Sequence, residues 1–144
     1  MKFLLDTNVV SELRKGARAD RKVAAWFKGL DPDELFLSVL VVGEIRRGIE
    51  GIRRRDPKTA QALDRWLVGL EAGFEDRILP VDRRVAEEWG RMNVPDPLPV
   101  LDALMAATAK VHGLVLATRN VKDVAPGVTA VNPFAAQEVA LTFR

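Results

Sequence analysis

Short apolar segments alternate along this chain with longer stretches in which apolar residues recur at helical spacing. The apolar segments predict β-strands at residues 2–5, 35–39, 78–81 and 114–117, with a fifth candidate at 128–131. Parallel strands need crossover connections, which are usually helices, and the strands here are separated by helix-like stretches. The pattern therefore predicts an α/β fold with a central parallel sheet of four to five strands covered by helices on both faces.

The stretches between these strands predict helices. Val23, Trp26, Phe27 and Leu30, for example, follow the i, i+3, i+4, i+7 spacing of one helix face. Thr7 or Asn8 is expected to cap the first helix. The predicted helices cover residues 9–15, 21–30, 41–53, 57 to about 72, 83–92 and 100–111, and residues 93–99, with three prolines, form a loop.

Length and composition narrow the class of protein. The 144 residues fit one domain, and 48% hydrophobic with 29% charged residues is an ordinary globular balance. The absence of Cys excludes disulfides, thiolate metal sites and cysteine nucleophiles. No apolar run reaches the roughly 18 residues of a membrane span. We therefore expect a cytoplasmic protein with a single domain over residues 1–144.

Acidic residues recur where predicted strands end or predicted helices begin. Asp6 directly follows the first strand, and in parallel sheets the ligand crevice lies beyond such strand ends. Glu44 lies near the start of the helix after strand two, and Asp102 lies about one turn into a helix that is otherwise almost wholly apolar. Asn120 and Asp123 follow strand four. Converging acids raise one another's pKa, and a divalent cation such as Mg²⁺ or Mn²⁺, which prefers oxygen ligands, relieves that repulsion.

Each acid also has a simpler explanation. Asp6 is as typical of a helix N-cap as of a ligand, Glu44 of a first-turn acid that favours the helix dipole, and Asp123 of an ordinary loop. Asp102 is the hardest to explain in this way. Taken together, four acids at corresponding ends of successive elements favour a metal site.

Three stretches of the sequence resemble the PIN-domain family, most closely the VapC-type and FitB-like toxins of bacterial toxin–antitoxin pairs. They are LLDTNVVSEL at residues 4–13, LSVLVVGEIRRGI at 37–49 and LDALMAATAKVHGLVLATRNVKD at 101–123. The resemblance covers nearly the whole chain. It implies a Rossmann-like, three-layer fold and a Mg²⁺- or Mn²⁺-dependent endoribonuclease.

By motif match, Asp6, Glu44 and Asp102 are similar to the first three metal-binding acids of this family. Many relatives carry a fourth acid where this chain has Asn120, so either Asp123 fills that role or Asn120 binds through its amide oxygen. Val124 also departs from the Phe that relatives commonly show. Three hydroxyl residues flank the acids and are candidates to orient ligands or water: Thr7, Ser38 and Thr118.

The hypothesis is metal-assisted hydrolysis of RNA phosphodiester bonds. Arg119, next to Asn120, and Arg46, on the helix of Glu44, are candidate RNA contacts. Arg46 belongs to a basic run for which a solvated helix face is an equally good interpretation. With only 6% aromatic residues, base stacking is not expected to drive recognition.

The resemblance further implies a homodimer and a cognate antitoxin, similar to VapB or FitA, whose C-terminal segment enters a groove among the early helices. Two other functions remain open at this point. One is a non-catalytic PIN-like module that binds RNA or protein. The other is a phosphotransfer or phosphatase domain with Asp6 as nucleophile, although such domains usually carry a second acid where this chain has Asn8.

Overall fold

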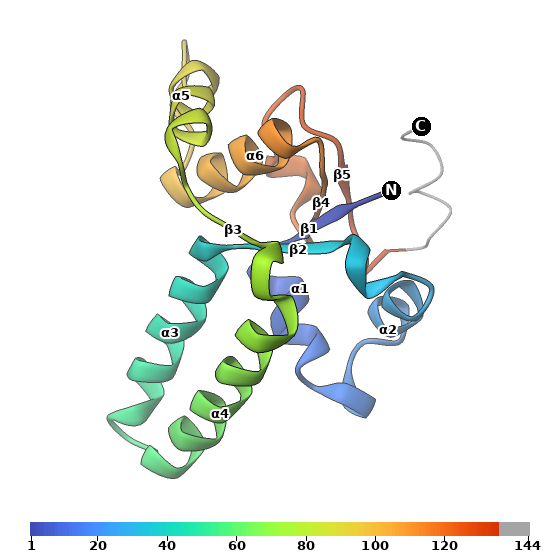
Figure 1. The fold of residues 1–144 in the computed structure, drawn as a ribbon, viewed down its shortest axis with the longest axis vertical. Coiled ribbons are helices and arrows are strands. Elements are labelled where there is room, and N and C mark those ends of the chain that lie inside the picture. Colours follow the sequence, from blue (N-terminus) through green and yellow to red (C-terminus); the bar gives the residue numbers. More distant parts are fainter. Residues whose placement is uncertain (136–144) are drawn as a thin grey trace.

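The fold is built on a parallel sheet between two layers of helices, as a computed structural model of residues 1–135 shows (Figure 1). The strand order is β3-β2-β1-β4-β5, and every pair in it is parallel. The strands are β1 Phe3–Leu5, β2 Leu35–Ser38, β3 Ile78–Leu79, β4 Val115–Ala117 and β5 Ala130–Val131.

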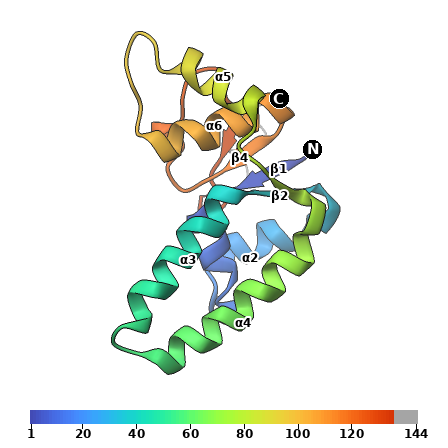
Figure 2. The same cartoon turned by 60° about the vertical axis from the view of Figure 1, so that its left-hand side comes forward.

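Helices cover both faces of this sheet, as two views of the ribbon show (Figures 1 and 2). Four of them, α1 to α4, lie on one side, and α5 and α6 lie together on the other. The long helices α3 and α4 form a hairpin that extends away from the sheet. The bounds are α1 Thr7–Leu13, α2 Arg21–Lys28, α3 Val39–Arg53, α4 Pro57–Phe74, α5 Arg83–Met92 and α6 Val100–His112. This arrangement confirms the predicted three-layer α/β fold.

The core forms where the central strands meet the helices. Leu4 and Leu37 are fully buried, and the ring of Phe3 packs edge-on against Trp26 with 5.1 Å between centroids. Strands buried on both faces read as short apolar runs, which is why the sequence pattern located them. Within residues 1–135, no helix is both long enough and apolar enough to cross a membrane.

The predicted boundaries differ from the structure at a few positions, each for a local reason. Asp6, not Thr7 or Asn8, is the N-cap of α1, which therefore begins two residues early at Thr7. Likewise, the side chain of Ser38 accepts a hydrogen bond from the Leu40 amide at 3.0 Å, so α3 begins at Val39, inside the predicted second strand. The third strand ends at Leu79 because Pro80 has no amide hydrogen to donate.

The strand order also determines where a ligand crevice forms. From β1 the sheet grows through β2 in one direction and through β4 in the other, so β1 and β4 flank the topological switch point. In sheets of this kind the crevice lies there, beyond the carboxyl ends of the strands. Asp6 and Thr118 are the first residues after these two strands.

Candidate active site

Asp6 is held rigidly at the switch point. Its backbone amide donates to the carbonyl of Ala117 at 2.9 Å, which extends the pairing of β1 with β4 by one residue. Its Oδ1 accepts the Thr7 amide at 2.8 Å, and its Oδ2 accepts the hydroxyl of Thr118 at 2.7 Å. The carboxylate is therefore both a helix cap and a fixed acceptor between two strands, so the two interpretations of Asp6 do not exclude each other.

Thr118 connects Asp6 to the loop after β4. Its side chain is buried, and its hydroxyl donates to Asp6 while accepting the amide of Asn120 at 3.2 Å. A hydroxyl with both roles fixes the carboxylate and the start of the loop relative to each other.

Three carboxylates from distant parts of the chain line one small cavity of about 30 Å³. Asp6 follows β1, Asp102 lies in the first turn of α6, and Asp123 ends a short 3-10 turn at Val121–Asp123. Thr118 and Asn120 add a hydroxyl and an amide to the same lining. The apolar part of the lining comes from Met105, Ala106, Leu116 and Val124. A space of this size accommodates a water molecule or a small ion.

The charges in this cavity act on Asp102. Partial burial raises the pKa of Asp102, and the negative charges of Asp6 and Asp123 raise it further. Asp102 itself remains exposed, so its carboxyl group lies at the mouth of the cavity. The three carboxylates, which line one cavity, therefore repel one another when they are ionised.

The donors in the cavity fit a hard divalent cation. Carboxylate, hydroxyl and amide oxygens are the ligands that Mg²⁺ and Mn²⁺ prefer. Within residues 1–135, no three Asp, Glu, His or Cys side chains already stand at the mutual spacing of a closed metal site. Mg²⁺ usually keeps several waters and takes only one or two carboxylates directly, so a looser set of acids around a water-sized space is compatible with it.

The sequence matches a family model that describes the PIN domain over residues 3–122. The chain belongs to the PIN-domain family. Its matched region contains every strand of the sheet except β5 and includes Asp6 and Asp102.

Named relatives and solved structures agree with this assignment. The PIN domain is 32% identical to toxin FitB of Neisseria gonorrhoeae over 140 residues, which cover 92% of this chain and 98% of that protein. It is also 32% identical to the VapC ribonuclease Y4jK of Sinorhizobium fredii, over 92% of this chain and 97% of that protein. The crystal structure of FitAcB from Neisseria gonorrhoeae matches with a TM-score of 0.84 and 31% identity, covering 93% of this chain and 99% of the other.

Glu44 lies outside the carboxylate cavity of the PIN domain, although it is linked to it. It is half-buried on α3 and accepts the hydroxyl of Thr7 at 2.6 Å, while the amide of Thr7 donates to Asp6. Glu44 lines a neighbouring cavity of about 170 Å³ together with Thr7 and Arg14. One threonine thus bridges the predicted second acid to the first.

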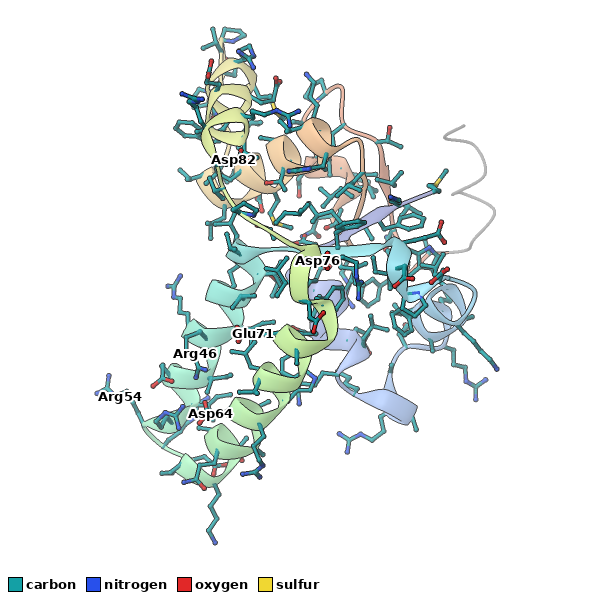
Figure 3. All side chains as sticks on the ribbon, viewed as in Figure 1. Arg46, Arg54, Asp64, Glu71, Asp76 and Asp82 are labelled. Atoms are coloured by element: carbon teal, nitrogen blue, oxygen red, sulfur yellow. The ribbon has the colours of Figure 1, made fainter. Side chains whose placement is uncertain are left out.

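Ser38 and Arg46 have other partners in the structure. Ser38 is fully buried, and its hydroxyl oxygen accepts the Leu40 amide as the N-cap of α3. Arg46 lies between α3 and α4, where its guanidinium donates to Asp64 at 2.7 Å and to Glu50 at 3.2 Å (Figure 3). Arg53 donates to the same two acids, and the two arginines lower the pKa of Asp64 to about 2.

Two residues near the cavity were not expected from the sequence. Asn8 accepts the backbone amide of Arg119 at 3.3 Å through its Oδ1. The guanidinium of Arg119 lies over the ring of Phe134 in a cation–π contact, with Cζ 3.8 Å from the ring centroid. Asn8 was visible within the first motif, but only as a helix cap. No signal in the sequence connects Phe134, which follows β5, to a loop that starts at β4.

Proposed function

We propose that this PIN domain is a Mg²⁺- or Mn²⁺-dependent endoribonuclease and the toxin of a VapBC-type toxin–antitoxin pair. The observation that carries the proposal is the cavity that Asp6, Asp102 and Asp123 line together at the switch point. The relatives named toxin FitB and VapC ribonuclease, each about as long as this chain, support the same function.

Asp6, Asp102 and Asp123 are the residues that would hold the cation, with Asn120 contributing its amide oxygen. Such a cation lowers the pKa of a bound water and offsets negative charge on the phosphoryl oxygens. Thr118 keeps the Asp6 carboxylate in one orientation, which reduces the reorganisation needed when substrate binds. Glu44, fixed by Thr7, is the candidate to orient the attacking water or to add a ligand from the side of α3.

Arg119 is the better of the two candidate RNA contacts. It is exposed beside the cavity-lining residues Thr118 and Asn120. The charge of Arg46 is already opposed by Asp64 and Glu50, so its attraction for an RNA phosphate is weakened. Arg54, at the C-terminal end of α3, points away from this ion-pair cluster (Figure 3). It remains a candidate for a non-specific electrostatic contact with the RNA backbone.

The proposed partners are RNA, a cognate antitoxin and a second copy of the chain. Solved structures that share the fold include a toxin–antitoxin complex from Klebsiella pneumoniae, with a TM-score of 0.66 and 26% identity, and FitAB bound to a DNA fragment, with a TM-score of 0.83 and 30% identity. An apolar cavity of about 110 Å³ between α1, α2 and α4 is the candidate groove for an antitoxin segment. It is lined by Leu5, Val10, Leu13, Arg14, Phe27, Trp66, Leu70 and Phe74.

The decisive experiment measures RNA degradation by the purified protein with Mg²⁺, with Mn²⁺ and with a chelator. We expect cleavage only with the metals, and a loss of at least 100-fold in the Asp102→Asn and Asp6→Asn variants, as for other groups that stabilise charge at a reacting phosphate. Asp96→Asn, an exposed acid of the α5–α6 loop, is the matched control and should cleave like the wild type.

Three further measurements on the same variants and in cells separate the alternatives. Unchanged RNA binding without any cleavage in all variants would favour the non-catalytic module. A trapped phospho-aspartate at Asp6 would favour phosphotransfer. In cells, growth arrest that is relieved by co-expression of a short neighbouring reading frame would support the antitoxin.

A further inference from the structure

Arg119 is a cation in the loop after β4 whose side chain packs on an aromatic ring. It lies between Thr118 and Asn120, which both line the acidic cavity, yet within residues 1–135 its guanidinium pairs with no carboxylate and makes no hydrogen bond. Its one side-chain partner in that part of the chain is the ring of Phe134, 3.8 Å from Cζ to the centroid.

Two contacts determine this position. The side chain of Asn8 accepts the Arg119 backbone amide and so ties the residue to the start of α1. The Phe134 ring packs against the hydrophobic core, and the Phe134 amide donates to the side chain of Asn132 at 2.9 Å, which fixes the turn that carries the ring. The stack is therefore anchored at both ends to ordered parts of the fold.

The consequence for Arg119 follows from its shape. A guanidinium that lies on an aromatic ring uses its face, and its N–H groups point outward along its edges, where they remain available to a bidentate oxygen ligand. A flexible arginine four residues before Asp123 would instead gain charge-assisted hydrogen bonds if it turned onto that carboxylate. The stack on the ring opposes this turn of the arginine onto a carboxylate. It also reduces the side-chain entropy that Arg119 loses when a ligand binds.

We propose that Phe134 is a positioning residue, which holds the guanidinium of Arg119 as a binding site for an RNA backbone phosphate, in the loop whose residues Thr118 and Asn120 line the carboxylate cavity. The proposal rests on the ribonuclease function proposed above and adds the residue that prepares its phosphate contact. Because Arg119 covers one face of the ring, Phe134 acts through the arginine and not by stacking on a base.

The test compares Phe134→Leu, Phe134→Tyr, Arg119→Ala and the double variant Phe134→Leu/Arg119→Ala in the cleavage of one single-stranded RNA with Mg²⁺. Leu keeps an apolar side chain without a ring, and Tyr keeps the ring. We expect Phe134→Leu and Arg119→Ala each to raise KM by about 10-fold, the usual scale of a hydrogen bond to a charged group, with kcat changed far less. Phe134→Tyr should retain the wild-type KM.

The double variant decides whether the ring acts through the arginine. We expect it to match Arg119→Ala alone, since removing the ring has no further effect once the guanidinium is gone. RNA binding by the Asp102→Asn protein gives a second readout. There, either single substitution should lower the slope of log affinity against log salt by roughly 0.7, the value for one phosphate contact on a single strand.

The outcomes separate this proposal from the function on which it rests. A wild-type protein that does not cleave RNA rejects both. A wild-type protein that cleaves, with Phe134→Leu showing the same KM and salt slope, rejects the role of Phe134 alone. Additive effects in the double variant also reject it, because they would mean that the ring contacts RNA directly.

Discussion

At the scale of single residues, the cavity contains a stabilising hydrogen bond to one carboxylate and electrostatic repulsion between carboxylates. Thr118 donates to Asp6 and stabilises it as an acceptor, whereas Asp102 gains no hydrogen-bonding partner within residues 1–135 and faces the charges of Asp6 and Asp123. Without a cation, the ionised Asp102 carboxylate therefore lowers the stability of the folded state. Such a loss of stability is common at sites where groups are arranged for function.

This repulsion predicts that Asp102→Asn makes the metal-free protein more stable. The folded-state pKa of Asp102 is raised, so ionised Asp102 opposes folding at any pH above its unfolded pKa of about 3.9. We expect a gain of about 0.5 kcal/mol at pH 7, allowing for solvent screening, or roughly 1–2 °C in Tm. The gain should disappear as the pH falls below about 4, where the carboxyl is protonated in both states.

Thermal unfolding in a chelator, followed by circular dichroism between pH 3 and 8, measures this effect. Asp96→Asn removes one negative charge from the exposed α5–α6 loop and controls for net charge. If both variants gain the same stability, the effect belongs to overall charge and the three acids do not repel one another appreciably.

At the scale of elements, the α3–α4 hairpin is held by charge as well as by apolar contact. Asp64 on α4 accepts from Arg46 and Arg53 of α3, each at 2.7 Å, and Glu50 joins the same cluster. Ile49, Ala60 and Leu67 form the buried apolar seam beneath it. The cluster thus fixes how the helix of Glu44 lies against α4.

The hairpin predicts a defined dependence of stability on pH. Arg53 and, next, Arg46 lower the pKa of Asp64 to about 2, against about 3.9 in the unfolded chain. Asp64 therefore stabilises the folded state above about pH 4, and that stabilisation is lost as the pH falls from about 4 to 2. Asp64→Asn should be less stable than the wild type at pH 7, with the difference closing across this window.

Urea unfolding at pH 2, 4 and 7 in low salt measures the difference in the free energy of unfolding between Asp64→Asn and the wild type. Asp76→Asn, at an exposed acid after α4, is the control and should show no comparable change. A difference between Asp64→Asn and the wild type that persists at pH 2 would assign the stabilisation to packing instead of charge. High salt should reduce the difference at pH 7 because these side chains are about one-third to one-half exposed.

The elements also show what the sequence alone could and could not supply. Strand and helix positions follow from apolar periodicity, and Asp6 and Asp102 were identified because each interrupts an apolar segment. The pairing of Arg46 with Asp64 could not be predicted, since Asp64 lies 18 residues away on another helix. The stack of Arg119 on Phe134 depends on how the loops after β4 and β5 approach each other, which no local pattern records.

At the scale of the whole molecule, the candidate site exists only in the folded chain. Asp6, Asp102 and Asp123 lie between 21 and 117 residues apart in the sequence. They come to line one cavity when β1 pairs with β4 and α6 packs against β4 and α5. A cation that binds among these carboxylates, directly or through its waters, binds the folded state and not the unfolded one, and a ligand of that kind stabilises the fold.

Mg²⁺ should therefore reverse the stability order of the wild type and Asp102→Asn. At a Mg²⁺ concentration 100 times the dissociation constant, binding adds about 2.7 kcal/mol, or roughly 5–10 °C in Tm. The wild type, slightly less stable than the variant in a chelator, should then become the more stable protein, because the variant lacks one of the carboxylates proposed to hold the cation. Differential scanning fluorimetry with MgCl₂, against NaCl at equal ionic strength, measures both curves. Parallel curves that never cross would show that Asp102 takes no part in binding the cation, even if the metal stabilises the protein elsewhere.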